Sequence, residues 1–320
     1  MVNSFSLSTS VLPSSCFRFS LQAKGAMILP PYKGAAFRGA LSNGMRRLVC
    51  ASSRKECNGC DLISNCLYAA VFEPGPPRNH PEAGKFATAP VPYVLTPPLS
   101  RQQAFRDEER LFFDLTLIGP AQDALPYLIY SAQSMGKRGF GHEKNRFNLL
   151  QVDKIENGCS AQVYDGASQT LLNADAPSIP VEPEQKSGIQ KLALEFLTPL
   201  RIKVRGDLAT DLNFALFFEN LGRRISLLSS FYGNNGNCPD PSDLLEKSRT
   251  IQTLSSDLVW YDWQRWSSRQ KDAMKLGGLI GKIAFEGDLG PFVPWLRLGE
   301  LVHVGQSTSF GLGKYMMIKE

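Results

Sequence analysis

The residues best suited to chemistry gather near the end of the chain, in the stretch LVHVGQSTSFGLGKY that spans residues 301–315. Its glycines permit close backbone approach and unusual φ angles. Backbone N–H groups that such a loop leaves uncovered can bind phosphate oxygens, and the hydroxyls and the lysine add further partners. A tight helix-to-strand turn is the alternative interpretation. The predicted phosphate-binding residues are Gly305, Ser307, Thr308, Gly311, Gly313 and Lys314.

Four of the seven cysteines form a second cluster, with the spacing C-x6-C-x2-C-x5-C at Cys50, Cys57, Cys60 and Cys66. Four thiolates suit a tetrahedral structural zinc that leaves no open position for catalysis. An iron–sulfur cluster uses the same ligands and is the alternative cofactor, and buried cysteines without a metal are the remaining interpretation. Seven cysteines in a chain of 320 residues do not indicate a disulfide framework, so we expect a reducing, cytoplasmic location.

Histidine chemistry has only three candidates, His80, His142 and His303. A histidine suits proton transfer because its pKa lies near neutral pH. His303 stands at the entrance of the glycine-rich stretch and near the end of an apolar helix, where the helix dipole favours the protonated ring. We therefore predict a proton-transfer role for His303, with a structural role at the helix end as the alternative. Lys33 and Tyr32 are further candidates, for charge stabilisation and proton transfer.

The basic residues are unevenly distributed. Residues 1–150 hold 17 Lys and Arg against 10 Asp and Glu, and eight basic residues precede Glu56, the first acidic one. An acid-free basic stretch predicts a polyanionic partner; a transit peptide or a solvated basic surface are the alternatives. No run approaches 18 apolar residues, so no membrane span is expected. The predicted contacts to the polyanion are Arg38, Arg46, Arg47, Lys137, Arg138 and Lys144.

The elements that must position these residues follow the same order in both halves of the chain. In the first half, alternation within 16–29 predicts a strand, and Phe37, Leu41, Met45 and Leu48 predict an amphipathic helix. Strands near 85–95 and 109–119, a helix after Pro120 and a strand at 147–152 complete the β-α-β-β-α-β order of a ferredoxin-like domain.

A proline-rich linker is expected at 165–188, and the second half then repeats the order. It predicts strands at 192–204, 257–266 and 276–286, a helix through Phe214 and Leu228, a helix from 290 to His303, and a last strand. The predicted fold is α+β, with two ferredoxin-like (RRM-like) domains in tandem. They span 1–165, with the cysteine insertion at 50–66, and 188–320, with the glycine-rich loop at 305–313.

Several stretches resemble the RAMP superfamily of CRISPR-associated RNA-binding proteins. The approach PWLRLGE and the ending FGLGKY resemble its C-terminal signature, and YKGAAFRGAL and LTPLRIK resemble the branch that processes CRISPR precursor RNA. A similar cysteine insertion follows the first helix in that branch. The resemblance covers most of the chain. It implies a metal-independent endoribonuclease that cleaves CRISPR repeat RNA into mature crRNA, leaving 2′,3′-cyclic phosphate and 5′-hydroxyl ends, with no catalytic metal.

One departure from the family pattern leaves a second function open. Many members carry a catalytic histidine in or just after the first helix, whereas this chain has Tyr32, Lys33 and Arg38 there. The alternative is a non-catalytic RAMP subunit that holds guide RNA in a CRISPR effector complex with other subunits. Single-stranded RNA is commonly held by base stacking on aromatic side chains, and Trp263 is the candidate for that contact, with hydrophobic packing on a strand as the alternative.

Overall fold

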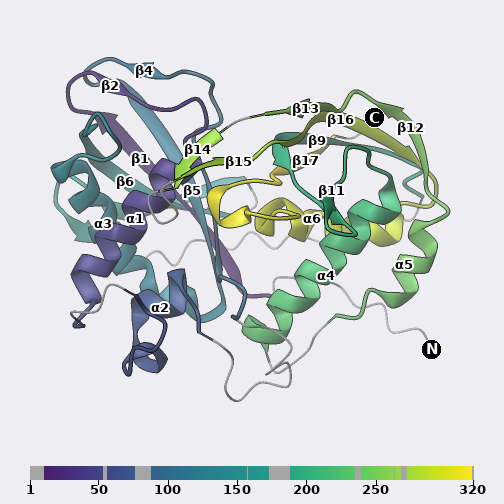
Figure 1. Cartoon of the computed structure of the whole chain (residues 1–320), viewed down its shortest axis with the longest axis horizontal. Helices are drawn as coiled ribbons and strands as arrows, with labels where there is room; N and C mark the ends of the chain where they lie inside the picture. The colour runs from purple at the N-terminus through teal and green to yellow at the C-terminus, as the bar shows by residue number, and fades with distance from the viewer. Residues whose placement is uncertain are drawn as a thin grey trace. The chain divides into compact units, whose positions relative to one another are not determined.

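The computed structural model describes residues 11–52, 56–75, 88–156, 158–172, 188–234, 239–262, 264–267 and 272–318, with only the backbone for 264–267 and 272–275 (Figure 1). Two compact units divide the chain: Pro13–Ile179, called here the N-terminal domain, and Pro180–Glu320 with Met1–Leu12, the C-terminal domain. His80 and Trp263 lie outside the described residues. Among the described residues, no helix is long and apolar enough to cross a membrane.

The N-terminal domain is built on an antiparallel sheet with the strand order β3-β5-β1-β6-β7-β8. Its strands are β3 (Tyr93–Thr96), β5 (Arg110–Ile118), β1 (Ser14–Ala23), β6 (Phe147–Glu156), β7 (Cys159–Asp165) and β8 (Thr170–Leu171). The helix α1 (Gly34–Val49) follows β1 and α3 (Leu125–Arg138) follows β5. The predicted β-α-β-β-α-β order is therefore present in β1, α1, β3, β5, α3 and β6, and β7 with β8 is an addition.

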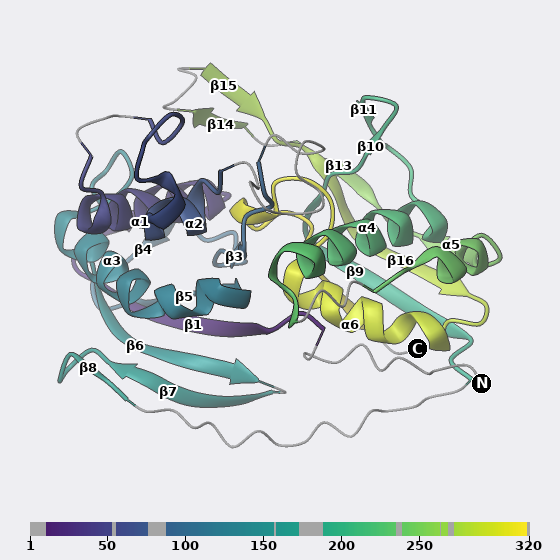
Figure 2. The ribbon, with the colours of Figure 1, turned by 90° about the horizontal axis from the view of Figure 1, so that it is seen from below.

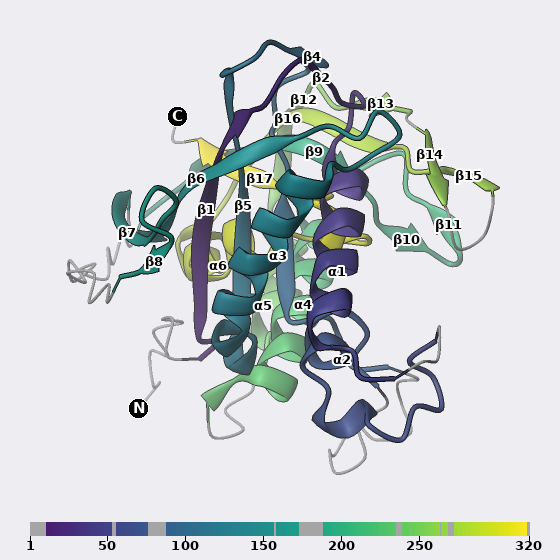
Figure 3. The same ribbon diagram turned by 90° about the vertical axis from the view of Figure 1, so that its left-hand side faces the viewer.

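The helices α1 and α3 lie side by side on one face of this sheet (Figures 2 and 3). Gly44 lets them approach closely, because a Cβ at Gly44 would lie 3.0 Å from the carbonyl oxygen of Ser131. The Phe37 ring contacts Phe140 just beyond the end of α3, at 5.1 Å between centroids, so the helices run antiparallel. The predicted apolar stripe of α1 is buried at Phe37, Leu41 and Met45, but Leu48 is 41% exposed and does not belong to it.

Short elements connect these larger ones. They are β2 (Met27–Ile28) paired with β4 (Ala104–Phe105), the 3₁₀ turns η1 (Ile63–Asn65) and η2 (Gly119–Ala124), and the helix α2 (Leu67–Phe72). The predicted linker at 165–188 begins too early, because Asp165 still belongs to β7 and β8 follows it; residues 173–187 lie outside the described residues.

The C-terminal domain repeats the arrangement around an antiparallel sheet with the order β12-β16-β9-β17. Its strands are β9 (Lys191–Leu200), β12 (Gln252–Ser256), β16 (Gly278–Glu286) and β17 (Tyr315–Ile318), and its larger helices are α4 (Phe214–Tyr232) and α6 (Val293–Val302) (Figure 1). The predicted stripe of α4, from Phe214 to Leu228, is confirmed, since its apolar members are fully buried. In both sheets the first and third strands of the β-α-β-β-α-β order are central.

The prediction of one strand at 257–266 is wrong. That stretch divides into β13 (Val259–Tyr261), which pairs with β16, and β14 (Gln264–Ser267), which pairs with β15 (Asp272–Lys275). The sequence pattern missed β12 because all five of its residues are exposed and it carries no buried alternation. The remaining short elements are β10 (Lys203–Val204), β11 (Asp207–Leu208), α5 (Ser242–Ser248), η4 (Gly290–Phe292) and η5 (Thr308–Phe310).

Candidate functional site

The glycines of the 305–313 loop have positive φ angles: +82° at Gly305, +91° at Gly311 and +72° at Gly313. The prediction of uncovered N–H groups is wrong for two of them. The N–H of Gly311 donates to the Thr308 carbonyl at 2.9 Å, and that of Gly313 donates to the Pro199 carbonyl at 3.0 Å. Gly313 also packs against a neighbouring carbonyl that any Cβ would strike. Backbone conformation and close packing therefore account for these glycines.

The loop is fastened to β9 through Thr198. Its hydroxyl donates to the Gly311 carbonyl at 2.7 Å and accepts from the Lys314 N–H at 2.8 Å. The Lys314 ammonium donates to the Glu300 carbonyl at 2.7 Å, and Thr308 is 4% exposed. The residues of the loop predicted to hold phosphate therefore also hold the loop together. Sequence reasoning missed Thr198, although it lies within the LTPLRIK stretch.

His303 ends α6 with an unusual backbone, φ +57° and ψ 176°. Its N–H donates to the Gly299 carbonyl at 2.8 Å, and its Nδ1 lies 3.2 Å from the Leu312 carbonyl oxygen, which requires a proton on Nδ1. The ring is 1% exposed. Arg224, which the sequence reading overlooked, donates from Nε to the carbonyls of Val302 at 2.8 Å and His303 at 3.1 Å. The Leu312 contact joins the end of α6 to the loop, and the Arg224 contacts join the end of α6 to α4.

The electrostatics of His303 are opposite to the sequence prediction. Burial lowers the pKa of its imidazole well below the ordinary 6.5, and the cations of Lys314 and Arg224 lower it further. The expected preference for a protonated ring is therefore wrong, because burial outweighs the helix dipole. A role in proton transfer stays a prediction, and the buried, carbonyl-bonded ring favours the structural alternative.

Lys33 and Tyr32 stand at the start of α1, where Lys33 is the residue before the first helical turn. Lys33 is fully buried, and its ammonium donates to the carbonyls of Ser100 at 2.7 Å and Pro31 at 3.4 Å. Burial lowers the pKa of Lys33 and raises the pKa of the Tyr32 phenol well above its ordinary value. At neutral pH the phenol is thus a protonated donor beside a partly desolvated ammonium.

The predicted basic residues fall into two groups, because α1 and α3 are antiparallel. Arg38 lies on the first half of α1, where it donates to the Tyr93 hydroxyl at 3.1 Å. Beside that half, at the end of α3 and in the turn after it, stand the exposed Lys137, Arg138 and Lys144. Arg46 and the exposed Arg47 lie at the far end of α1. The structure therefore separates Arg46 and Arg47 from the basic residues at the end of α3, and it directs the Arg38 guanidinium to Tyr93 and Phe72.

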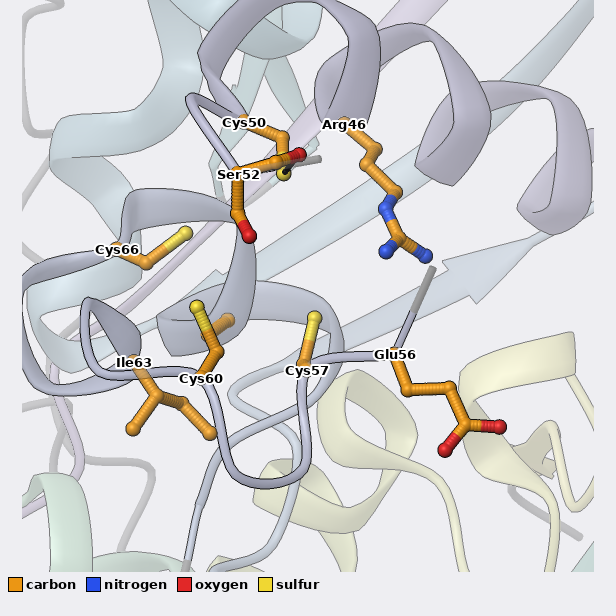
Figure 4. Close-up of a pocket in the computed structure, with 9 residues that line it drawn as sticks. Arg46, Cys50, Ser52, Glu56, Cys57, Cys60, Ile63 and Cys66 are labelled. Carbon is orange, nitrogen blue, oxygen red and sulfur yellow. Dashed lines mark hydrogen bonds between the residues drawn. The ribbon is translucent and has the colours of Figure 1, made fainter. Parts of the chain in front are cut away.

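The four clustered cysteines point their sulfur atoms toward one small cavity, which Arg46 also lines (Figure 4). Cys57 is 9% exposed. Its burial, and to a smaller extent the negative charge of the Glu73 carboxylate, raise the pKa of its thiol to about 11. As they stand, the described side chains form no group of three or more His, Cys, Asp or Glu placed to hold a metal ion. The predicted metal site therefore stays a prediction, although its donors share one cavity.

Family models match a part of the chain in each of the two domains. Residues 12–176, which are more than half of the chain, match the AF_1859_N family, described as an N-terminal domain. Residues 194–315 match the family of the CRISPR-associated endoribonuclease Cas6. An uncharacterised protein of Archaeoglobus fulgidus is 27% identical over 291 residues, which span 89% of this chain and 91% of that protein.

Solved structures share the fold at low sequence identity. A Cas6 product complex superposes with a TM-score of 0.57 at 13% identity, covering 95% of this chain and 99% of that one. Thermus thermophilus Cas6 gives a TM-score of 0.54 at 15% identity, covering 95% and 98%. A partial Cas6-RT-Cas1–Cas2 complex gives 0.55 at 14% identity and covers 97% of this chain but 47% of that one. The α+β architecture with antiparallel sheets is therefore that of Cas6 proteins.

Proposed function

Because this chain belongs to the AF_1859_N family and matches the CRISPR-associated endoribonuclease Cas6 family over residues 194–315, we propose that it binds CRISPR repeat RNA and cuts it to release mature crRNA. The observation that carries the proposal is the Cas6 match over residues 194–315, which contains β9, α4, α6 and the loop that leads into β17. The Cas6-like architecture of the whole chain supports it. Its partners are the repeat RNA, the crRNA product and other subunits of a CRISPR complex.

The proposed reaction is an attack by the RNA's own 2′-hydroxyl on the adjacent phosphorus, without a catalytic metal. A bond forms between O2′ and phosphorus, and the bond from phosphorus to O5′ breaks. The O2′ proton passes to a base, and an acid protonates O5′, which leaves a 2′,3′-cyclic phosphate and a 5′-hydroxyl. The protein has to supply proton transfer and a positive charge beside the phosphorane.

Tyr32 and Lys33, which are adjacent in the chain, match two of these requirements, the acid and the cation. The Tyr32 phenol is protonated at neutral pH, since its ordinary pKa is 10.0 and burial raises that pKa further, so it can donate a proton to O5′. The Lys33 ammonium is the cation proposed to stabilise the phosphorane. Because it is buried and donates to the Ser100 and Pro31 carbonyls, it acts through its charge and not as a direct donor to the phosphate. We propose His303 as a positioning residue that holds the glycine-rich loop, acting through its bond to Leu312.

RNA binding is proposed at the basic group around the start of α1. Lys137, Arg138 and Lys144 are exposed there and available to phosphates. Arg38 has a mixed role, because its guanidinium also donates to Tyr93 within the domain. The backbone of the RNA supplies most of the affinity in such complexes, so contacts of this kind make binding depend on salt.

The second candidate function is a RAMP subunit that binds guide RNA and cuts nothing. One observation favours it: His303, the histidine of the family-like C-terminal stretch, is 1% exposed and its Nδ1 faces the Leu312 carbonyl. A chain without an accessible histidine in that stretch would retain the fold and the basic surface while lacking a base.

Incubation of the purified protein with CRISPR repeat RNA in EDTA separates the two functions. The enzyme is expected to cut at one position, to leave a cyclic phosphate, and to fail on RNA with a 2′-deoxy nucleotide at that position. Tyr32→Phe should cut on the order of 10²–10⁴ times more slowly with RNA affinity preserved. Tyr130→Phe is the matched control, because Tyr130 is 55% exposed on α3. Tight binding without cleavage by the wild type would establish the non-catalytic subunit.

The same assay assigns His303. His303→Asn retains an amide N–H that can donate to Leu312. If the residue positions the loop, this variant cleaves at close to the wild-type rate once the folded fraction is taken into account. A loss on the order of 10²–10⁴ in rate, with folding and RNA affinity intact, would instead make His303 the proton-transfer residue.

A further inference from the structure

Three separate backbone segments bring the four clustered cysteines of the N-terminal domain to one cavity (Figure 4). Cys50 is the residue that ends α1, and Cys66 is the residue before α2. Cys57 and Cys60 belong to the turn between these helices. Residues as far as sixteen positions apart thus supply the same kind of soft donor to a common space, and thiolates of this kind suit zinc.

The local backbone of the turn is shaped to present two thiols together. The Cys60 N–H donates to the Cys57 carbonyl at 3.1 Å, and the Ile63 N–H donates to the Cys60 carbonyl at 3.1 Å. Gly59 has a φ of +73°, a value that glycine adopts without the cost a side chain would add. This turn places the two sulfurs on one side of the chain, as the chelating pair of a tetrahedral site requires.

Arg46 is the second observation at this cavity. Its guanidinium lines the same space as the sulfurs, and it lies over the Tyr68 ring at 5.6 Å from the centroid. A zinc ion with four thiolates carries two net negative charges, and a partly buried cation beside them offsets that charge. Arg46 therefore has a use at the cysteines that is separate from contact with RNA.

We propose that Cys50, Cys57, Cys60 and Cys66 bind one structural zinc ion, which fastens the end of α1 to the start of α2, and that Arg46 stabilises it as a countercharge. The ligands have to close around the metal from their present positions. Rotation of each thiol about its Cα–Cβ bond between staggered positions supplies such a movement. Binding replaces the thiol protons with the metal and adds its free energy to folding.

Elemental analysis of the protein purified under reducing conditions tests the site directly. We expect about one zinc per chain. Cys57→Ser combined with Cys60→Ser should lose the zinc, whereas Cys159→Ser should keep it, because Cys159 is exposed on β7 and lies outside the cavity. Cobalt(II) exchanged into the wild type should give thiolate-to-metal charge-transfer absorption. Protein that holds no zinc and binds neither zinc nor cobalt when they are supplied would overturn the proposal, and so would iron with inorganic sulfide.

The role of Arg46 is tested by competition with a chelator of known affinity. Arg46→Gln should bind zinc on the order of 10- to 100-fold more weakly, the usual effect of losing a partner just outside the ligands. Arg47→Gln is the matched control, because Arg47 is exposed and does not line the cavity. Equal affinities in the two variants would remove Arg46 from the site. These measurements involve no RNA, so their failure would leave the proposed function untouched.

Discussion

The structure predicts that the C-terminal domain loses stability as pH falls below about 6.5, and that His303 causes the loss. In the native domain burial and two neighbouring cations hold the His303 pKa well below 6.5, so the ring stays neutral. In the unfolded chain the ring takes up a proton near its ordinary pKa. Between these two pKa values the unfolded state binds more protons than the native state, so stability rises with pH.

The magnitude follows from the ordinary pKa of 6.5. Proton uptake by His303 stabilises the unfolded state by less than ~0.1 kcal/mol at about pH 7.5. At about pH 5.5 the same uptake stabilises the unfolded state by about 1.4 kcal/mol. The loss continues at about 1.4 kcal/mol per pH unit until the native pKa is reached. His303 should therefore account for a difference of about 1.4 kcal/mol between the two conditions.

The assay is urea unfolding followed by tryptophan fluorescence at the two pH values. All four tryptophans lie at residues 260–295, so the signal reports on the domain that holds His303. His303→Asn should remove the contribution of about 1.4 kcal/mol, since an amide does not titrate, while the slope against urea stays unchanged. His142→Asn should keep the difference, because the His142 side chain is 97% exposed.

Two results would refute the reasoning. One is an equal pH difference in wild type and His303→Asn, which would assign the effect to other groups. The other is a wild-type domain that loses less stability than His303→Asn when the pH falls to about 5.5, which would require a raised native pKa and a charged His303 in the folded state. The second result would also restore the protonated ring that the helix dipole alone suggests.

Three further predictions concern the loop, a helix cap and the basic surface. Gly313→Ala should lower the free energy of unfolding, measured by urea titration, by more than about 1 kcal/mol, because it adds a clash with a carbonyl to a strained φ. Gly206→Ala should lower it by less, since the added Cβ meets open space. Asn213→Ala should lower the free energy of unfolding by about 1 kcal/mol in thermal or urea unfolding, because the Asn213 side chain accepts a hydrogen bond from the Leu216 N–H at 2.9 Å at the start of α4. An unchanged free energy would mean that water replaces this hydrogen bond in the variant. Replacing Lys137 and Arg138 together by alanine should weaken repeat-RNA binding and flatten its salt dependence in filter-binding titrations, and an unchanged slope would exclude them as phosphate contacts.

Apolar periodicity in the sequence determined most of the fold. Alternation marked β1 and β5, and the stripe from Phe214 to Leu228 marked α4, because burial of one face imposes these periods directly. Exposed elements have no such pattern. The polar strand β12 was not predicted for that reason. The strands Val259–Tyr261 and Gln264–Ser267 were predicted as one strand, although they pair with different strands.

Residue types and spacing also identified the cysteine cluster, the glycine-rich loop and the family resemblance. The roles of individual side chains depended on tertiary structure. The sequence around His303 suggested a charged ring at a helix end, but packing against Leu312, Lys314 and Arg224 makes it neutral and buried. Arg46 appears in the sequence as one of a basic run. The antiparallel course of α1 and α3 separates it from Lys137, and the chain that follows α1 folds back to bring further cysteines beside it. The spacing of residues in the sequence shows which side chains a segment carries. The desolvation of a side chain and the charges around it depend on segments that are distant in the sequence.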